Sequence, residues 1–568
     1  MTEPASNNPF APKLPSLADL IETVGSDLTL HAQRRRNLTS SIRSFAKAFD
    51  KSPAQFVAHP NFLRSFLKRL HPEQCRFTKS RISNIKSDLQ FALTRYVGKG
   101  SGRYMTPFSE SWQTIWDLAV GQKALYARRW ASRLMHFCSA QQISPDSVND
   151  HVAARLLEAL IEESLVLNPR ERWKGILRAW NRLADLLPSR SLPKLSIPDD
   201  SRTYTISLKE FPESFQSEVE AAIKQWSGSD LLDEDAPEKP LAPATLKKRR
   251  IQLRELASGL VLSGWDIGNV NSIAVLVEVE AAKTILRFYL ERAGGKKTSR
   301  VHGLAVILKT LARHIVGVEE DHYQQLASLC DRLDPKHSGM TEKNRGRLRP
   351  FDDPRNVGLI LNLPKKTTDH ARLNDSGTEK DALRVQWAVA VEILLMAPMR
   401  RKNLAGLHID RHILRTRSSD GAVHLVIPGV EVKNGEPLDY CLPQETTELL
   451  DIYLRDFRPR LCTPDNPWLF PGQAPDKSKS EHTLSIQIKN YIQRETGLEV
   501  HVHLFRHLAA KLFLDQNPGQ YESVRRHLGH RSMETTLRAY AGMETAAASR
   551  HFDATILKLR HRASGAIL

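Results

Sequence analysis

The sequence predicts a multidomain protein that is mainly α-helical and carries one small antiparallel β-sheet. The chain has 568 residues, which is too long for one compact hydrophobic core. Apolar residues recur at helical spacing through most of the first 330 residues. Two strand-like runs, residues 423–432 and 438–442, flank an Asn-Gly pair, which is a strong hairpin signal.

The helical region contains three segments of similar plan, residues 28–98, 125–187 and 245–317. In each, an early and a late helix carry apolar residues at helical spacing, as Trp130 and Leu134 do in the second segment. Two interpretations stay open. The segments are copies of one unit of about 70 residues, or they are unrelated four-helix segments that look alike in sequence.

Two segments have the composition of linkers. Residues 188–244 are rich in Ser, Pro, Asp and Glu, although residues 213–226 have a helical pattern. Residues 334–353 carry five basic residues among Gly and Pro, which is typical of an extended basic connector. The expected order is an N-terminal helical domain (1–110), a second helical domain (111–190), a linker (191–240), a third helical domain (241–335), a basic linker (336–350) and a C-terminal domain (351–568).

The C-terminal domain is expected to be mixed. An apolar helix over residues 382–396 precedes a hairpin, whose turn is expected at Lys433-Asn434-Gly435-Glu436. Helices are expected afterwards at residues 446–457, 484–494, 503–514, 521–528 and 533–540.

Composition favours a polyanionic partner only modestly. Lys and Arg total 82 against 64 Asp and Glu, a formal charge of +18, and a generally basic surface explains this equally well. The start of the chain has no apolar signal segment, and no apolar run approaches the ~18–20 residues that span a bilayer. Five scattered cysteines indicate neither a zinc site nor a disulfide framework. We expect a cytoplasmic protein with no membrane partner.

The last seventy residues carry the side chains best suited to chemistry. His503, Arg506 and His507 form an H-x-x-R-H run, and a Leu-Gly-His sequence ending at His530 precedes Tyr540 by ten positions. A guanidinium can hold phosphate oxygens, and imidazoles can donate hydrogen bonds or move protons near neutral pH. A phenol is a weak nucleophile that needs such cationic surroundings. The run therefore suggests attack on a phosphodiester by a tyrosine.

Two basic residues upstream fit the same chemistry. Arg400 stands at a break between two helices, and Lys433 lies in the expected hairpin turn, from which it could protonate a leaving oxygen. Taken singly, each of these side chains also has an ordinary reading as a solvated cation or a packed ring, and His507 is best read as packed and hydrogen-bonded. The histidines at positions 503 and 507 could bind zinc, but no acidic or cysteine partner has a suitable spacing, so no metal is expected.

In this order and spacing the residues resemble the tyrosine recombinase, or phage integrase, family. The flanking sequences HLFRHLAAKLF, RRHLGHRSMETTLRAYAG and NPWLFPG look like those of family members. Two features depart from the family pattern. Asn403 replaces the usual acidic residue, and the His-to-Tyr spacing is 540 − 530 = 10 instead of nine. The six catalytic positions of the family are filled here by Arg400, Lys433, His503, Arg506, His530 and Tyr540.

The resemblance implies a site-specific DNA recombinase that performs integration, transposition or resolution. Tyr540 would form a 3′-phosphotyrosine, the two arginines would hold the phosphate, the histidines would assist, and Lys433 would protonate the 5′ oxygen. Neither metal nor cofactor would be needed. The implied partners are double-stranded DNA in the nucleoid, a homo-tetramer across two DNA sites, and accessory DNA-bending proteins. The alternatives are a non-catalytic DNA-binding partner and a relaxing enzyme like the type IB topoisomerases.

Basic clusters open the helical segments, and residues 245–317 look like the family's core-binding domain. We expect Lys247, Lys248, Arg249 and Arg250 to contact DNA phosphates, and a solvated helix start is the alternative. Similar clusters stand at residues 34–36 and 128–129. A helix over residues 545–559, with Phe552, Ile556 and Leu559 on one side, is expected to dock on a neighbouring protomer or within its own subunit.

Overall fold

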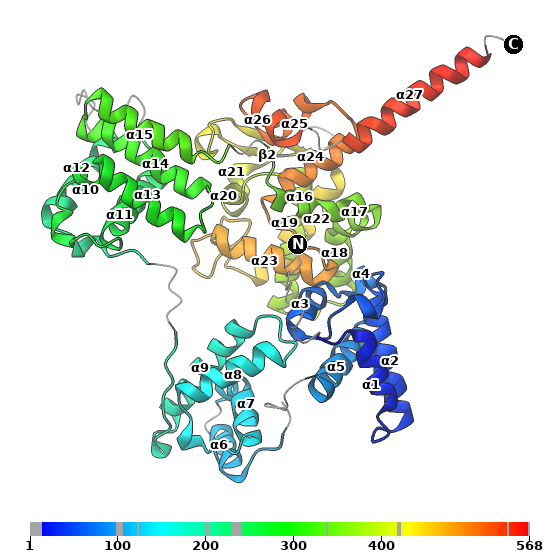
Figure 1. Cartoon of the computed structure of the whole chain (residues 1–568). Coiled ribbons are helices and arrows are strands. Elements are labelled where there is room, and N and C mark those ends of the chain that lie inside the picture. Colours follow the sequence, from blue (N-terminus) through cyan, green and yellow to red (C-terminus); the bar gives the residue numbers. More distant parts are fainter. Residues whose placement is uncertain are drawn as a thin grey trace. The chain divides into compact units, whose positions relative to one another are not determined.

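The structure is a computed structural model that describes residues 14–97, 106–121, 124–198, 204–228, 240–336, 339–416, 422–541 and 545–565. It is mostly helical, with one three-stranded antiparallel sheet, so the predicted fold class is confirmed. The chain divides into two compact units, one formed by Met1–Pro198 with Gly339–Leu568 and the other by Asp199–Ser338. Figure 1 shows the helices along the chain.

The first helical region has an aromatic and aliphatic core of its own. Leu38, Ile42 and Phe45 are fully buried on one side of α2 and meet Ile85 and Leu89 of α5. The spacing of these residues is that of an amphipathic helix, so the opposite side of α2 remains in solvent. The elements are α1 (Leu17–Ser26), α2 (Ala32–Lys47), η1 (Pro53–Gln55), α3 (Pro60–Arg69), α4 (Pro72–Cys75) and α5 (Lys79–Tyr96).

The second helical region packs around tryptophans. Trp112 and Trp180 are fully buried with ring centroids 5.6 Å apart, and the Trp173 indole donates to the Ala153 carbonyl. The elements are α6 (Glu110–Gly121), α7 (Leu125–Ala140), η2 (Pro145–Ser147), α8 (Asp150–Glu162), α9 (Pro169–Leu186) and η3 (Pro188–Arg190).

The second unit contains part of the expected linker. Phe215 and Val219 of α10 are fully buried in the same core as Leu253 and Leu256 of α11, so residues 213–227 pack as a helix of this unit. Residues 199–203 and 229–239 of the expected linker lie outside the described residues. The elements are η4 (Leu208–Glu210), α10 (Glu213–Ser227), α11 (Pro243–Val261), η5 (Ile267–Asn269), α12 (Ile273–Val277), α13 (Val279–Arg292), α14 (Ser299–Leu311), η6 (Ala312–Val316) and α15 (Glu320–Leu333).

The C-terminal region is organised around α19 (Glu379–Met396), most of whose apolar side chains are buried. The expected basic connector is not extended throughout, because α16 (Glu342–Leu348) forms inside it and Leu348 is buried in the C-terminal core. The helices before the sheet are η7 (Arg349–Asp352), α17 (Pro354–Leu361), α18 (Leu363–Leu373), α20 (Arg401–Ala405) and α21 (Ile409–His412). Those after it are α22 (Gln444–Ile452), η9 (Tyr453–Phe457), η10 (Arg458–Arg460), α23 (Glu481–Thr496), α24 (Leu504–Gln516), α25 (Tyr521–Leu528), α26 (Met533–Tyr540) and α27 (Thr545–Gly565).

The sheet has the order β1 (Ile413–Arg415), β2 (Val423–Ile427), β3 (Leu438–Leu442), and all pairings are antiparallel. The predicted pairing of the two hairpin strands is confirmed. The predicted Asn-Gly pair does lie in a turn, in which the Gly435 N–H donates to the Val432 carbonyl at 3.0 Å, but this turn does not join the two strands directly. Strand β2 ends at Ile427, because Pro428 has no N–H for the ladder, and a 3₁₀ turn (Gly429–Glu431) follows. The strands are therefore joined by a ten-residue loop, residues 428–437.

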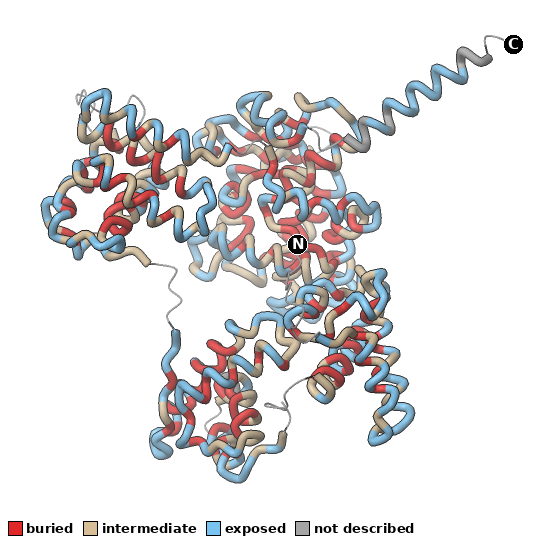
Figure 2. Tube along the Cα trace, in the orientation of Figure 1, coloured by how far each residue is buried: buried red, intermediate tan, exposed pale blue. Residues whose placement is uncertain are grey.

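The last helix, α27, is more exposed to solvent than the helices of the packed regions. Figure 2 shows buried residues along the inner sides of the helices in each region, whereas α27 is exposed over its described side chains. Phe552, Ile556 and Leu559 of α27 are 65%, 41% and 54% exposed, so the described residues of their own subunit leave much of these side chains in solvent. In the described ranges, no helix combines the length and the apolar character that crossing a bilayer requires.

Candidate active site

The first guanidinium of the site is placed by a helix break. Helix α19 ends at Met396, and Arg400 caps the start of α20 with an extended backbone. Its Nη1 donates to the Asn434 side-chain oxygen at 3.1 Å, and the Asn434 amide donates in turn to the Gly529 carbonyl at 2.7 Å. The hairpin loop therefore holds half-buried Arg400 against the Leu-Gly-His turn.

The second guanidinium is held more rigidly. Arg506, in the first turn of α24, is only 3% exposed. Its Nη1 donates to the Pro398 carbonyl at 2.8 Å and its Nη2 to the Leu528 carbonyl at 2.7 Å. Burial and the positive charge of Arg400 lower the pKa of Arg506. Neither arginine is paired with a carboxylate among the described residues, so both charges are available to an anion.

Two imidazoles beside the arginines are held in their neutral form. Gly529 ends α25 with a φ of +59°, and His530 follows it and shares a 2.9 Å hydrogen bond between its Nδ1 and the Thr536 hydroxyl. Burial, Arg506 and Arg400 lower the pKa of His530 to about 4. Desolvation and the same two arginines also lower the pKa of His503, which caps α24 and keeps part of its ring in solvent. Both rings can therefore accept a proton at neutral pH.

The phenol of Tyr540 lies at the end of α26 and is 2% exposed. Its ring stacks on His530 with a centroid distance of 6.2 Å and an interplanar angle of 5°. The His507 ring meets it edge-on at 5.7 Å. Burial raises the pKa of Tyr540 to about 12, against the opposing charge of Arg506. The spacing of ten positions from His530 to Tyr540, one more than the family's nine, thus does not separate the two rings.

Two further groups at the site lie outside the six predicted catalytic positions, and only Tyr440 was missed by motif reasoning. His507 packs as expected, between His503 and Tyr540, but its buried Nδ1 has no hydrogen-bond partner in the described part of the chain. The Tyr440 hydroxyl of β3 is likewise buried without a described partner, and burial raises its pKa to about 12, opposed by Arg506 and Arg400. The last position of the H-x-x-R-H run pointed to His507. For Tyr440, strand alternation indicated only the buried side of β3.

Lys433 lies in the loop between β2 and β3, and Asn403 of α20 supports that loop. Neither residue belongs to the cluster of rings and guanidinium groups. Lys433 is exposed, and its ammonium makes no hydrogen bond or ion pair to any described residue. The Asn403 side chain donates to the Glu431 carbonyl at 3.2 Å, so it supports this loop at the position where the family has an acidic residue. The other five predicted catalytic residues lie close together. The His530 and Tyr540 rings are in contact, and the charge of Arg506 acts on the pKa values of His503, His530 and Tyr540.

The predicted DNA-binding residues of α11 differ in their surroundings. Lys247 and Lys248 are exposed and unpaired among the described residues. The Arg249 guanidinium lies over the Trp226 ring at 5.8 Å, and Arg250 forms an ion pair with Glu220. No group of three or more His, Cys, Asp or Glu suited to a metal ion occurs in the ranges that the structure covers.

Part of the chain is similar to known proteins. Residues 368–546 match the phage integrase family. Tyrosine recombinase XerC of Pseudomonas savastanoi pv. phaseolicola is 26% identical over 242 residues, which are 42% of this chain and 71% of that protein. XerC of Pseudomonas fluorescens Pf0-1 is 24% identical over 309 residues, 53% of this chain and 85% of that protein.

Two solved structures resemble the chain distantly. The XerH site-specific recombinase bound to difH substrate is 14% identical with a TM-score of 0.31, covering 59% of this chain and 92% of that one. The Tn1549 transposon integrase bound to transposon right end DNA is 14% identical with a TM-score of 0.34, covering 58% and 98%.

The family match spans Arg400 to Tyr540, and the fold gathers five of the six expected catalytic side chains within that span. Residues 368–546 therefore form a tyrosine recombinase domain of the phage integrase family, whose members are DNA strand-transferring enzymes.

Proposed function

We propose that the protein is a site-specific recombinase that cuts and rejoins DNA through a 3′-phosphotyrosine on Tyr540. The observation that carries the proposal is a buried phenol packed between two imidazoles, beside a guanidinium without a carboxylate partner. Such a site is suited to a phosphodiester, because the charge that develops on its oxygens meets fixed donors.

The chemistry begins with the Tyr540 oxygen attacking phosphorus. Because its pKa is about 12, the phenol is protonated at neutral pH and must give its proton to a base. The rings of His530 and His507 touch the phenol ring, and both have pKa values of about 4, so they are neutral and able to accept. The phosphorus–O5′ bond then breaks, and Lys433 protonates the departing 5′ oxygen.

Arg400 and Arg506 would hold the two non-bridging oxygens of the phosphate throughout this step. A 5′-hydroxyl of a second strand reverses the reaction and rejoins the DNA in a new arrangement. The energy of the broken bond is retained in the phosphotyrosine, so the reaction needs no nucleotide cofactor.

The assembly would contain double-stranded DNA and four protomers acting on two sites, as the family resemblance implies, with accessory DNA-bending proteins as further partners. The exposed Phe552, Ile556 and Leu559 of α27 support docking of this helix on a neighbouring protomer. Lys247 and Lys248 of α11 would contact phosphates, because they are the exposed cations of that cluster that have no described partner, whereas exposed Arg250 is paired with Glu220.

A nicked suicide substrate tests the proposal. Inverted repeats flanking the gene supply candidate DNA, and the parent protein should form a protein–DNA adduct that survives denaturation. Tyr540→Phe should form none, while Tyr323→Phe, a matched loss of a hydroxyl in α15, should behave like the parent. Absence of an adduct on every such DNA would favour a non-catalytic partner. Relaxation of supercoiled DNA without any special site would favour a topoisomerase.

A further inference from the structure

We propose that the solvent side of α2 is a second DNA-binding surface, which holds the sugar–phosphate backbone of a duplex. This side, called here the α2 basic face, is formed by Arg35, Arg36, Thr39, Ser40, Arg43, Ser44 and Lys47. The inference rests on the proposed function for the identity of the polyanion. It assigns a ligand to a region that lies outside the family match.

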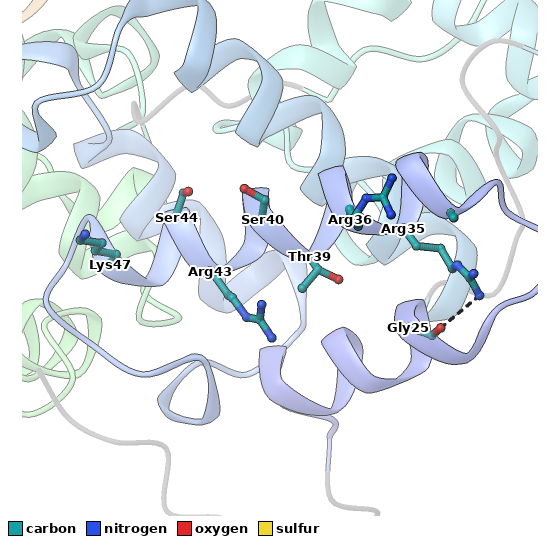
Figure 3. A pocket seen from close by; sticks show the side chains of 9 residues that line it. Gly25, Arg35, Arg36, Thr39, Ser40, Arg43, Ser44 and Lys47 are labelled. Carbon is teal, nitrogen blue, oxygen red and sulfur yellow. Dashed lines mark hydrogen bonds between the residues drawn. The ribbon is translucent and has the colours of Figure 1, made fainter.

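Helical spacing places these side chains together. Arg36, Ser40, Ser44 and Lys47 follow one another at intervals of four, four and three residues, and Arg35, Thr39 and Arg43 form a parallel row at intervals of four. Figure 3 shows both rows extending from α2. The remaining side of the helix carries Leu38, Ile42 and Phe45 into the core, so the basic face cannot turn inward.

The charges of the α2 basic face are not neutralised within the described protein. Neighbouring Arg34, outside the face, is the only arginine of its run that meets a carboxylate, Asp88 at 2.7 Å. Arg35 donates to the Gly25 carbonyl at 3.3 Å, and Arg36 to the Gln33 side-chain oxygen at 2.6 Å. Both of these partners are uncharged. Arg43 and Lys47 are exposed and have no described partner. Four cations on one helix repel one another, and a polyanion would relieve that repulsion.

The hydroxyl groups between the cations are also arranged as donors. The Arg81 guanidinium of α5 donates to the Ser44 hydroxyl at 2.8 Å and to the Ser40 hydroxyl at 3.0 Å. Each hydroxyl therefore accepts from Arg81 and can turn its own hydrogen outward, toward a phosphate oxygen. A fifth positive charge thus lies directly behind the face.

The lining of the face selects its ligand. The groove of about 600 Å³ is lined by cationic and hydroxyl side chains with Gly25 and Ala32, and among the described residues no aromatic ring lines it. Single strands are bound by stacking their bases on aromatic rings, so this surface is unsuited to them. Arg, Lys, Ser and Thr are the usual partners of duplex phosphates. From Arg36 to Lys47 the helix rises about 16 Å, which matches about five base pairs along a duplex.

The consequence is binding without sequence choice at the N-terminal region, which adds contacts to those of the recombinase domain. A double variant, Arg43→Gln with Lys47→Gln, removes the two unpaired cations without touching the core. The matched control is Lys79→Gln with Lys86→Gln, because these exposed lysines lie on the side of α5 turned away from Arg81. Both variants lose two charges from the same helical region.

The affinity of each full-length protein for a long duplex of unrelated sequence is measured by fluorescence anisotropy at several salt concentrations. Each lost phosphate contact reduces the slope of log affinity against log salt by about 0.9. When salt rises from about 50 to about 200 mM, the affinity of the Arg43/Lys47 variant should therefore fall by a factor about 12 times smaller than that of the parent. At low salt the variant should bind more weakly than the parent. The Lys79/Lys86 control should keep the parent's slope.

An unchanged slope in the Arg43/Lys47 variant, or an equal change in the control, overturns the proposal. A larger effect on duplex RNA than on duplex DNA overturns the assignment to DNA. The variant should still form the Tyr540 adduct on a nicked substrate. If the parent forms no adduct, the proposed recombinase activity fails, while the comparison of salt slopes still decides whether α2 binds DNA.

Discussion

Replacing Arg506 by lysine should cost stability as well as activity, because this arginine joins two separate backbone segments. Its guanidinium donates to the Pro398 and Leu528 carbonyls, and a lysine ammonium keeps the charge but can reach only one of them. One charge-assisted hydrogen bond, worth about 1.5–3 kcal/mol, is lost, and a buried carbonyl is left without its donor. We expect a total loss of about 2–4 kcal/mol, since these two terms overlap.

Arg400→Lys is the matched comparison. Arg400 is half-buried and donates to one side chain, Asn434, so its replacement should cost less than about 1.5 kcal/mol. Calorimetry should place the unfolding of the C-terminal region about 4–16 °C lower in Arg506→Lys. Hydrogen exchange should become faster in α24 and at the end of α25. Both variants should lose adduct formation by about 10²–10³-fold, because each removes part of the phosphate clamp.

The two measurements separate the structural role of Arg506 from its chemical role. Unfolding of Arg506→Lys at the parent's temperature would mean that the two carbonyl bonds contribute nothing to the fold. An equal loss of stability in Arg400→Lys would mean that burial and bridging do not distinguish the two arginines. Either result would refute the reasoning.

Three further perturbations test other features of the site. Tyr440→Phe removes a buried hydroxyl that has no described partner, so thermal unfolding should show no loss of stability, and a loss above about 1 kcal/mol would reveal a partner. Gly529→Ala should cost about 1–3 kcal/mol in urea unfolding, because φ is +59° and a Cβ would lie 2.5 Å from the Leu438 side chain. Gly519→Ala, with φ +84° and open space, should cost less, and equal costs would exclude the clash. The free energy of unfolding should fall as pH decreases from about 6.5 to about 4. In this pH range three imidazoles bind protons in the unfolded chain but stay unprotonated in the folded protein. His507→Gln should reduce that slope by up to about 1.4 kcal/mol per pH unit, and an unchanged slope would contradict a depressed pKa at this ring. The three imidazoles with pKa values of about 4 are those of His501, His507 and His530.

In the hairpin, local sequence patterns predicted the second strand but not the shape of the loop. Alternation at Leu438, Tyr440 and Leu442 predicted a half-buried strand, and these residues are buried in β3. The Asn-Gly pair also predicted a tight turn, but Pro428 ends β2 five residues before Lys433. The loop shape follows from Pro428 and from the close approach of Gly429 to the Gly435 carbonyl, where a Cβ would lie 2.3 Å away. This approach joins two residues six positions apart within one loop, and the propensities of a four-residue turn do not contain it.

Helix α10 illustrates the same limit for domain boundaries. Residues 191–240 have the composition of a linker, yet Phe215 and Val219 pack into the core of the second unit. Composition averages over a window, whereas burial depends on a few apolar side chains at helical spacing.

The sequence by itself determined the chemical inventory of the site, because the order and spacing of Arg400, His503, Arg506, His530 and Tyr540 are properties of the chain. Only the tertiary structure decided that His507 touches the phenol and that the Tyr440 hydroxyl is buried near both guanidinium groups. These contacts join residues far apart in the chain, as the bond from Arg506 to the carbonyl 108 positions earlier does. Packing of the core brings such residues together, and no local pattern encodes it.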